Sequence, residues 1–341
     1  LTQRMLATQE TGTGAMGQIS LLLKAVIATS LTMQALLAAV FLPRFLSMGI
    51  DPVRAVWDAV FMAISVFNNA GFVILPEGLS PHVTDWWMLI PIILGTTVGA
   101  IGFPVIMDVA KNLRTPRRWR LHTKLTLSTY LILAFVGALA LALTEWNNPA
   151  TLGAIDTPSK ILNAMLAGVN SRSSGLSALD VGAMQTQTHF VQDILMMIGG
   201  GSASTAGGVK VTTFAVLVLA VIAEARGDRD IETFGRRIPT SAVRLAVAVS
   251  LLGLALVAVS VVLLLSMTSY SLDIILFETA SAFATVGLST GITPILPVGA
   301  KYVLIFLMFA GRTGSMTVAA ALALRERSRV IRMPEERPII G

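Results

Sequence analysis

The sequence predicts an all-α membrane protein that crosses a bilayer several times, and three observations support this fold class. Of the 341 residues, 54% are hydrophobic and 13% are charged, whereas about a quarter are charged in an ordinary soluble domain. Uncharged stretches long enough to span a bilayer recur at residues 25–43, 86–107, 125–144 and 245–272. Basic residues are concentrated between these stretches. The absence of cysteine excludes a disulfide framework, a thiolate metal site and a cysteine nucleophile.

The basic residues predict how the chain is oriented in a cell membrane. Most of the 25 Lys and Arg residues fall in four segments, which contain Arg4 and Lys24; Lys111, Arg114, Arg117, Arg118, Arg120 and Lys124; Arg226, Arg229, Arg236, Arg237 and Arg244; and Arg325, Arg327, Arg329, Arg332 and Arg337. The opposite loops contain only Arg44, Arg54, Lys160 and Lys301. By the positive-inside rule, the four segments, including the C-terminus, are expected in the cytoplasm. The net charge of +6 therefore indicates orientation in lipid and not a nucleic-acid partner.

Each excursion from the cytoplasm contains a segment too short to span the membrane. In chain order these are residues 53–69, 158–169 and 273–284, compared with the roughly 20 residues that a spanning helix needs. The first two begin with an N-capping residue and a proline, Asp51-Pro52 and Thr157-Pro158, which is typical of a helix start. The sequence therefore predicts three re-entrant pore helices.

All three short segments run into a glycine. Gly71, Gly175 and Gly287 are separated by 104 and 112 residues, a period that fits a unit of helix, pore helix and helix. The chain is therefore expected to contain three such repeats, at residues 1–122, 123–238 and 239–325, and a cytoplasmic tail at residues 326–341. One glycine alone would more simply be a helix cap or a close helix contact.

The three loops are expected to form one cation site. A pore helix that enters from outside points its carbonyl end, equivalent to about half a negative charge, at the membrane centre. The outgoing loop can aim carbonyls at a dehydrated ion, because glycine permits the backbone angles that this requires. The predicted ion-binding backbone is that of Asn68, Asn69, Ala70 and Gly71; Arg172, Ser173, Ser174 and Gly175; and Ala284, Thr285, Val286 and Gly287. The Arg172 side chain is expected to point away from the axis, since it would repel permeating cations.

Two interruptions in the helices that follow a filter are candidate gates. Residues 199–208 contain five glycines, and each glycine costs a helix about 1 kcal/mol relative to alanine. Arg312 lies between uncharged half-helices, where a charged residue is a functional candidate by default. The predicted gate residues are Gly199, Gly200, Gly201, Ser202, Gly207, Gly208 and Arg312. The structural alternatives are a close-packing surface of small residues and an arginine that ties carbonyl oxygens.

At these residues the sequence resembles the Trk/Ktr/HKT superfamily of potassium transporters, and most of all its Ktr-type membrane subunit. The stretches that carry the resemblance are residues 65–72, 121–125, 199–213, 281–293 and 334–341. The resemblance implies potassium uptake across the cytoplasmic membrane through four M1-P-M2 repeats (helix, pore helix, helix) around one axis, with K+ in a single selectivity filter. It further implies a homodimer, a cytosolic nucleotide-binding ring of RCK type, an arginine of the last helix at the gate, Na+ as a candidate activator and no organic cofactor.

The sequence departs from the family pattern in two places. The family has four repeats, and the three in this chain resemble the second, third and fourth, so the first is expected to precede Leu1. The loop of the family's third repeat reads Arg172-Ser-Ser-Gly-Leu176, where the family more often has Arg-Thr-Ala-Gly-Phe. This difference affects the packing behind the filter.

Three alternatives to potassium transport remain open. A sodium-permeable or weakly selective transporter of the same superfamily fits the same motifs. An intramembrane hydrolase is remote, because His82, His122 and His189 all lie at loops or outer edges and none is mid-span with a serine. A scaffold without transport leaves three pore helices unexplained. The chain is therefore not expected to be an enzyme.

Overall fold

The computed structural model describes residues 19–314, and this part of the chain is predominantly helical. The first unit contains α2 (Ile19–Ser47), α3 (Pro52–Phe67), α4 (Trp86–Ile101) and α5 (Phe103–Lys111); the second contains α6 (Leu121–Glu145), α7 (Thr157–Asn170), α8 (Thr186–Met197) and α9 (Val211–Arg226); the third contains α10 (Thr240–Met267), α11 (Leu272–Ala284) and α12 (Val298–Phe309). A two-stranded antiparallel hairpin, β1 (Ile231–Thr233) and β2 (Arg236–Ile238), pairs Ile231 with Ile238 between the second and third units. Short 3-10 turns occupy Ser80–His82, Pro116–Arg118, Leu152–Ala154, Val181–Ala183 and Thr293–Ile295.

The all-α membrane fold predicted from the sequence is confirmed. Among the described residues, α2, α6 and α10 are each long and apolar enough to cross a bilayer, and the bent pair α4 and α5 makes a fourth candidate. The helices α3, α7 and α11 coincide with the predicted short segments to within two residues. The terminal segments, including the predicted cytoplasmic tail at residues 326–341, lie outside the described residues.

The pore helices begin where the sequence predicts, with one correction. Asp51 caps α3, because its carboxylate accepts from the amides of Val53 at 3.1 Å and Arg54 at 3.3 Å. In α7 the cap is Asp156 and not Thr157: the Asp156 carboxylate accepts from Ser159 N at 3.3 Å, and Thr157 is already helical. An aspartate one residue earlier reaches the same free amides, so the start moved by one position.

A third interruption, missed in the sequence, corrects the expectation of one span over residues 86–107. α4 and α5 are bent by 96° at Gly102, which has a φ of 92°. Pro104 is the second residue of α5 and has no N–H to donate back to α4. The two interruptions predicted from the sequence are also present: one lies between α8 and α9, and the other is the π-helical turn at Ala310–Gly314 that contains Arg312. Each unit therefore has a broken second helix.

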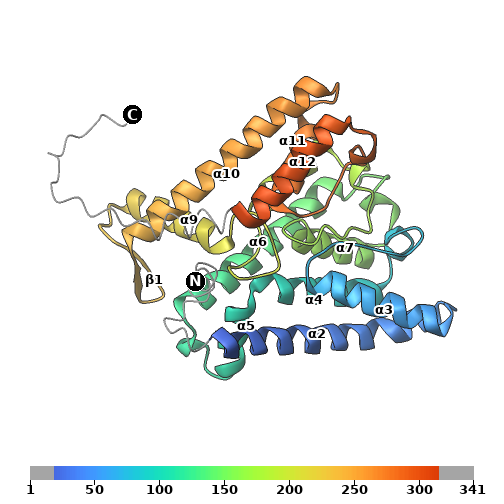
Figure 1. Ribbon diagram of the computed structural model, residues 1–341, viewed down its shortest axis with the longest axis horizontal. Coiled ribbons are helices and arrows are strands. Elements are labelled where there is room, and N and C mark those ends of the chain that lie inside the picture. The colour runs from blue at the N-terminus through green and yellow to red at the C-terminus, as the bar shows by residue number, and fades with distance from the viewer. Residues whose placement is uncertain (1–18, 315–341) are drawn as a thin grey trace.

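The units pack in a repeating order around the pore helices. Each pore helix packs on the long helix before it, in the pairs α2 with α3, α6 with α7 and α10 with α11. The second and third pore helices also pack on the second helix of the preceding unit, in the pairs α4 with α7 and α8 with α11. Figure 1 shows the three units side by side, from blue α2–α5 through green and yellow α6–α9 to orange and red α10–α12. This order brings the three filter loops together.

Candidate functional site

The three predicted filter loops contact one another in chain order. A Cβ added at Gly71 would lie 2.1 Å from the carbonyl oxygen of Ser174, and one added at Gly175 would lie 2.3 Å from that of Val286. Real Cβ atoms do not approach so closely, so both positions need glycine. At Gly287 nothing among the described residues lies within 4 Å of such an atom. The first loop therefore contacts the second and the second contacts the third, whereas the described residues leave open space beside Gly287.

The loop backbones visit left-handed conformations that most side chains avoid. Asn69 and Gly71 have φ angles of 52° and 75°, and Thr285 and Gly287 have 51° and 97°. In the middle loop only Gly175 is left-handed, with a φ of 64°. Such alternation turns neighbouring carbonyls toward one side. The first and third loops thus share one backbone pattern, and the loop that departs from the family sequence also departs in conformation.

Polar side chains from the last turn of each pore helix hold the outgoing loops. Ser65 Oγ donates to Phe72 O at 2.7 Å, Asn170 Nδ2 donates to Leu176 O at 2.8 Å, and Ser281 Oγ accepts from Gly287 N at 3.2 Å. Sequence reasoning missed these three residues. The pattern that would have found them is a polar residue five or six positions before each filter glycine.

The first loop residues differ in what their side chains do. Asn68 caps its own helix, because its Nδ2 donates to Ile64 O at 2.9 Å. Ala70 N donates to Ser65 O at 2.9 Å and closes the last turn of α3. Asn69 is buried and turns its amide toward the second loop, where Ser173 Oγ donates to Asn69 Oδ1 at 2.9 Å.

The Arg172 side chain points away from the filter loops. It is fully buried, it donates from Nη1 to Tyr130 O at 2.9 Å, and its guanidinium carbon lies 3.7 Å from the centre of the Tyr130 ring. A cation stacked on an aromatic face is attracted to the negative ring face. The arginine thus ties the second loop to α6 from behind, which agrees with the expected direction.

Glu278 is a buried carboxylate on the last pore helix that sequence reasoning also missed. It is 4% exposed. Its Oε1 accepts from Ser289 Oγ at 2.8 Å and from the amide and hydroxyl of Thr290 at 2.8 and 3.0 Å. Its Oε2 accepts from Thr293 Oγ1 at 2.6 Å. The sequence could have pointed to this residue, because an acidic side chain within an apolar pore helix is a functional candidate. In the structure, the Glu278 carboxylate holds the segment that follows Gly287.

Replacing Glu278 with Gln is expected to weaken the preference for K+ over Na+ while the protein still assembles. Glutamine keeps the shape but loses the charge that strengthens these bonds, and a hydrogen bond to a charged group is worth about 1.5–3 kcal/mol. Ion competition in vesicle flux measures the effect, with the exposed Glu77→Gln as control. Unchanged selectivity in Glu278→Gln would rule out a role in holding the loop.

The glycine-rich loop 199–208 is wedged between the α4–α5 break and the third filter loop. Gly201 N donates to Ala100 O at 2.8 Å, and Gly199 N donates to Val209 O at 2.9 Å. A Cβ at Gly207 would lie 2.1 Å from Thr285 Oγ1 and 2.6 Å from Ala284 O. Cβ atoms would also meet carbonyl oxygens within 2.5 Å at Gly199 and Gly200. The small residues are therefore required by close packing in this position of the loop.

Two further residues predicted for the gate, Ser202 and Gly208, belong to the same loop. Ser202 Oγ is 3.2 Å from Thr212 Oγ1, and Gly208 has a left-handed φ of 69°. Phe103 N, just after the α4–α5 break, donates to Ala203 O at 3.4 Å. The break between α4 and α5 therefore contacts the glycine-rich loop.

The side chain of Arg312 contacts the glycine-rich loop. Its Nη1 donates to the backbone carbonyl of Thr205. A Cβ at Gly311 would lie 1.6 Å from Phe283 O, so the π-helical turn touches the end of the last pore helix. The arginine and the loop, which are 107 residues apart, are thus brought together.

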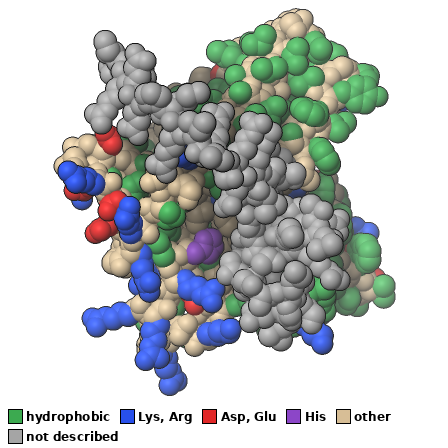
Figure 2. Space-filling model, turned by 60° about the vertical axis from the view of Figure 1, so that its left-hand side comes forward, with side chains coloured by type: hydrophobic (Ala, Val, Ile, Leu, Met, Phe, Trp, Pro, Cys, Tyr) green, Lys and Arg blue, Asp and Glu red, His purple; other side chains and the backbone are tan. Residues whose placement is uncertain are grey.

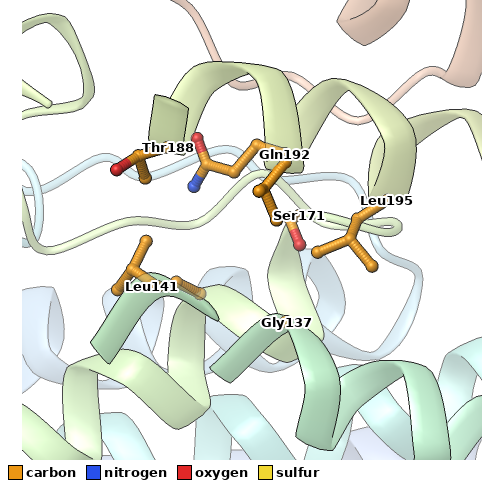
Figure 3. Close-up of a pocket in the computed structure, with 8 residues that line it drawn as sticks. Gly137, Leu141, Ser171, Thr188, Gln192 and Leu195 are labelled. Carbon is orange, nitrogen blue, oxygen red and sulfur yellow. The ribbon is translucent and has the colours of Figure 1, made fainter. Parts of the chain in front are cut away.

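A small cavity lies behind the second loop (Figure 3). Gly137 and Leu141 of α6 face Thr188, Gln192 and Leu195 of α8 across it, and Ser171 reaches it from the end of α7. Its lining contains no charged side chain and none of the predicted filter residues. The cavity is therefore separate from the predicted cation site.

Basic residues gather at one end of the molecule. Figure 2 shows Lys and Arg side chains on this face and hydrophobic side chains on other parts of the view. The first turn of α6 meets the β hairpin, because the Lys124 ammonium lies 5.8 Å from the centre of the Phe234 ring. Buried Leu125 of α6 and Ile238 of β2 belong to the same apolar cluster. Two of the predicted basic segments are thus joined in one surface.

The amino-acid sequence is similar to those of known cation transporters. The TrkH family model, described as a cation transport protein, matches residues 1–331. Ktr system potassium uptake protein B of Bacillus subtilis is 36% identical over 341 residues, and the protein of that name from Vibrio alginolyticus is 34% identical over 284 residues. Potassium/sodium uptake protein NtpJ of Enterococcus hirae is 33% identical over 312 residues.

The fold is also that of a solved transporter. The crystal structure of the potassium transporter TrkH from Vibrio parahaemolyticus matches with a TM-score of 0.71 and 18% identity, over 92% of this chain and 65% of that one. The three sequence matches cover 100%, 83% and 89% of this chain and 76%, 62% and 67% of those proteins, in the order given. The chain thus spans between 62% and 76% of the length of these proteins.

Proposed function

The chain belongs to the TrkH family of cation transport proteins, and from this premise we propose that it forms the pore for potassium uptake across the cytoplasmic membrane. The observation that carries the proposal is the contact of three glycine loops in chain order, each at the C-terminal end of a short helix. Three partial negative charges at helix ends favour a cation at their meeting point. Two relatives are named potassium uptake proteins, which supports K+ as the ion.

The filter is proposed to consist of the loop backbones of residues 68–71, 172–175 and 284–287. Left-handed residues alternate with ordinary ones in the first and third loops, which suits carbonyl coordination of a dehydrated ion. The position of Arg172 supports this assignment, because its guanidinium contacts Tyr130 and not the filter loops. A positive side chain on the pore axis would repel permeating cations.

Residues 199–208 and Arg312 are proposed to form the gate below this filter. The loop packs directly beneath Ala284 and Thr285, and Arg312 holds it through the Thr205 carbonyl. Backbone hydrogen bonds to the α4–α5 break and side-chain hydrogen bonds from Asn69 and Arg312 hold the loop in this position. Release of the Arg312 contact would therefore loosen the loop.

A fourth helix, pore helix, helix unit is proposed to close the ring beside Gly287. The repeats are assigned to residues 1–122, 123–238 and 239–325. Two apolar helix faces lack a neighbour within the described region: α3 exposes Val53, Val56, Trp57, Val60 and Ile64, and α12 exposes Val298, Tyr302, Ile305, Phe306 and Phe309. In the packing order of the other units, α3 lacks a preceding second helix and α12 a following pore helix.

The basic end of the molecule is proposed to face the cytoplasm. The positive-inside rule places it there, and its Arg residues offer a docking surface for a regulatory ring of RCK type. The membrane unit is proposed to be a homodimer, and Na+ is proposed as an activator on the basis of the family resemblance alone.

Ion flux into vesicles that contain the purified protein tests the proposed function. We expect K+ uptake that excess Na+ does not abolish. Equal uptake of the two ions would instead indicate a weakly selective transporter. Absence of flux of either ion from folded dimer would contradict the pore assignment.

A further inference from the structure

The side chain of Asn69 joins two filter loops to the glycine-rich loop. Its Nδ2 donates to Thr205 Oγ1 at 2.6 Å, and its Oδ1 accepts from Ser173 Oγ at 2.9 Å. Asn69 is 6% exposed, so water has little access to replace these partners. The partners lie 136 and 104 residues away in the sequence. The amide therefore bridges three segments that the sequence keeps far apart.

The Thr205 hydroxyl is fully engaged in this position of the loop. It donates to Gly99 O at 3.0 Å, next to the α4–α5 break, and it accepts from Asn69. A hydroxyl has one proton and two lone pairs. Because its proton is donated to Gly99 O, the hydroxyl can take part in the bond with Asn69 only as an acceptor, through a lone pair. The carbonyl of the same threonine accepts from Arg312.

The backbone of Asn69 depends on these side-chain bonds. Its φ of 52° is left-handed, a conformation that asparagine tolerates better than most residues but that still needs support. Asn69 lies two residues before the filter glycine Gly71. The side-chain bonds of Asn69, one of them to the glycine-rich loop, therefore support this left-handed residue beside the filter glycine.

We propose that Thr205 of the glycine-rich loop is a specificity-determining residue of the filter, acting through the side chain of Asn69. The inference rests on the filter and gate roles proposed above and adds a coupling between them. When the loop moves, Asn69 loses its partner and the first filter loop loses its fixed shape. By reciprocity, K+ binding that requires the held shape favours the loop in place.

Calorimetric binding of K+ and of Na+ to the purified protein tests the coupling. Thr205→Val keeps the β-branched shape and removes the hydroxyl, and it is expected to lower the ratio of K+ to Na+ affinity by about fivefold, the effect of one hydrogen bond. Thr205→Ser restores the hydroxyl and is expected to restore the ratio. Thr97→Val is the matched control, because Thr97 is also half-buried and its hydroxyl donates to Ile93 O within α4 at 2.7 Å.

A double-mutant cycle separates direct coupling from general loosening. Asn69→Gly permits the left-handed backbone and removes the amide, and in combination with Thr205→Val it is expected to be no worse than the more affected single variant. Additive losses, or wild-type affinity ratios in Thr205→Val, would overturn the proposal. Deletion of residues 200–207 tests the proposed gate separately. Unchanged flux after the deletion would refute the gate, and the role of Thr205 would then be decided by the calorimetric K+ and Na+ affinities of its variants alone.

Discussion

Gly71→Ala is expected to reduce potassium uptake to background. The new Cβ would lie 2.1 Å from the Ser174 carbonyl oxygen, so the first and second filter loops must separate. The left-handed backbone adds roughly 1–2 kcal/mol for a residue with a side chain. If the loops separate far enough to relieve this contact, their carbonyl oxygens no longer match the size of a dehydrated ion. Uptake is measured in cells that lack their own potassium uptake, together with the amount of protein in the membrane.

Two other glycines provide a matched control for this prediction. Gly49 and Gly78 are also left-handed, with φ angles of 76° and 64°, but nothing lies within 4 Å of an added Cβ. Alanine at either position carries the backbone cost without the collision, and near-normal uptake is expected. If all three variants lose uptake equally, backbone strain alone explains the loss and the contact between the loops is not functional.

Local patterns in the sequence predicted the elements of the fold well. Asp51-Pro52 marked the start of α3, and the uncharged stretches marked α2, α6 and α10. The break at Gly102 was missed because the apolar run continues through it without a charge, although Gly102 and Pro104 stood in the sequence. The composition of a segment shows that it is apolar, but it does not show a bend. The 96° bend depends on the φ angle of Gly102 and on the N–H that Pro104 lacks.

Contacts between distant segments could not be predicted from one sequence. The bonds from Asn69 to Ser173 and Thr205 join residues in different repeats, and no local pattern specifies such a pair. Glu278 is different, since a charge within a pore helix is visible in the sequence. Its role emerges only when Ser289, Thr290 and Thr293 fold back onto it.

Arg312→Ala is expected to raise the potassium flux per assembled dimer several-fold. The variant removes the hydrogen bond to the Thr205 carbonyl and therefore loosens the glycine-rich loop. It also removes a positive charge beneath the filter, whose repulsion of a cation roughly 10 Å away is about 1.7 kcal/mol at an effective dielectric constant of about 20. Both effects favour ion passage. Arg312→Lys is expected to fall between the two, because it keeps the charge and loses the planar donor fork.

Flux normalised to purified dimer distinguishes a gate from a structural arginine. A structural role predicts that Arg312→Ala lowers the yield of folded protein and its flux together, because the loop would lose a brace. Lys301→Ala is the control: it removes a charge from α12, where the ammonium donates to Pro294 O at 2.7 Å, on the outer side by the proposed orientation. A normalised flux that rises in Arg312→Ala and not in Lys301→Ala requires the arginine to restrain permeation from below the filter. If the normalised flux of Arg312→Ala does not rise, the arginine serves assembly and the gate must be assigned to the glycine-rich loop alone.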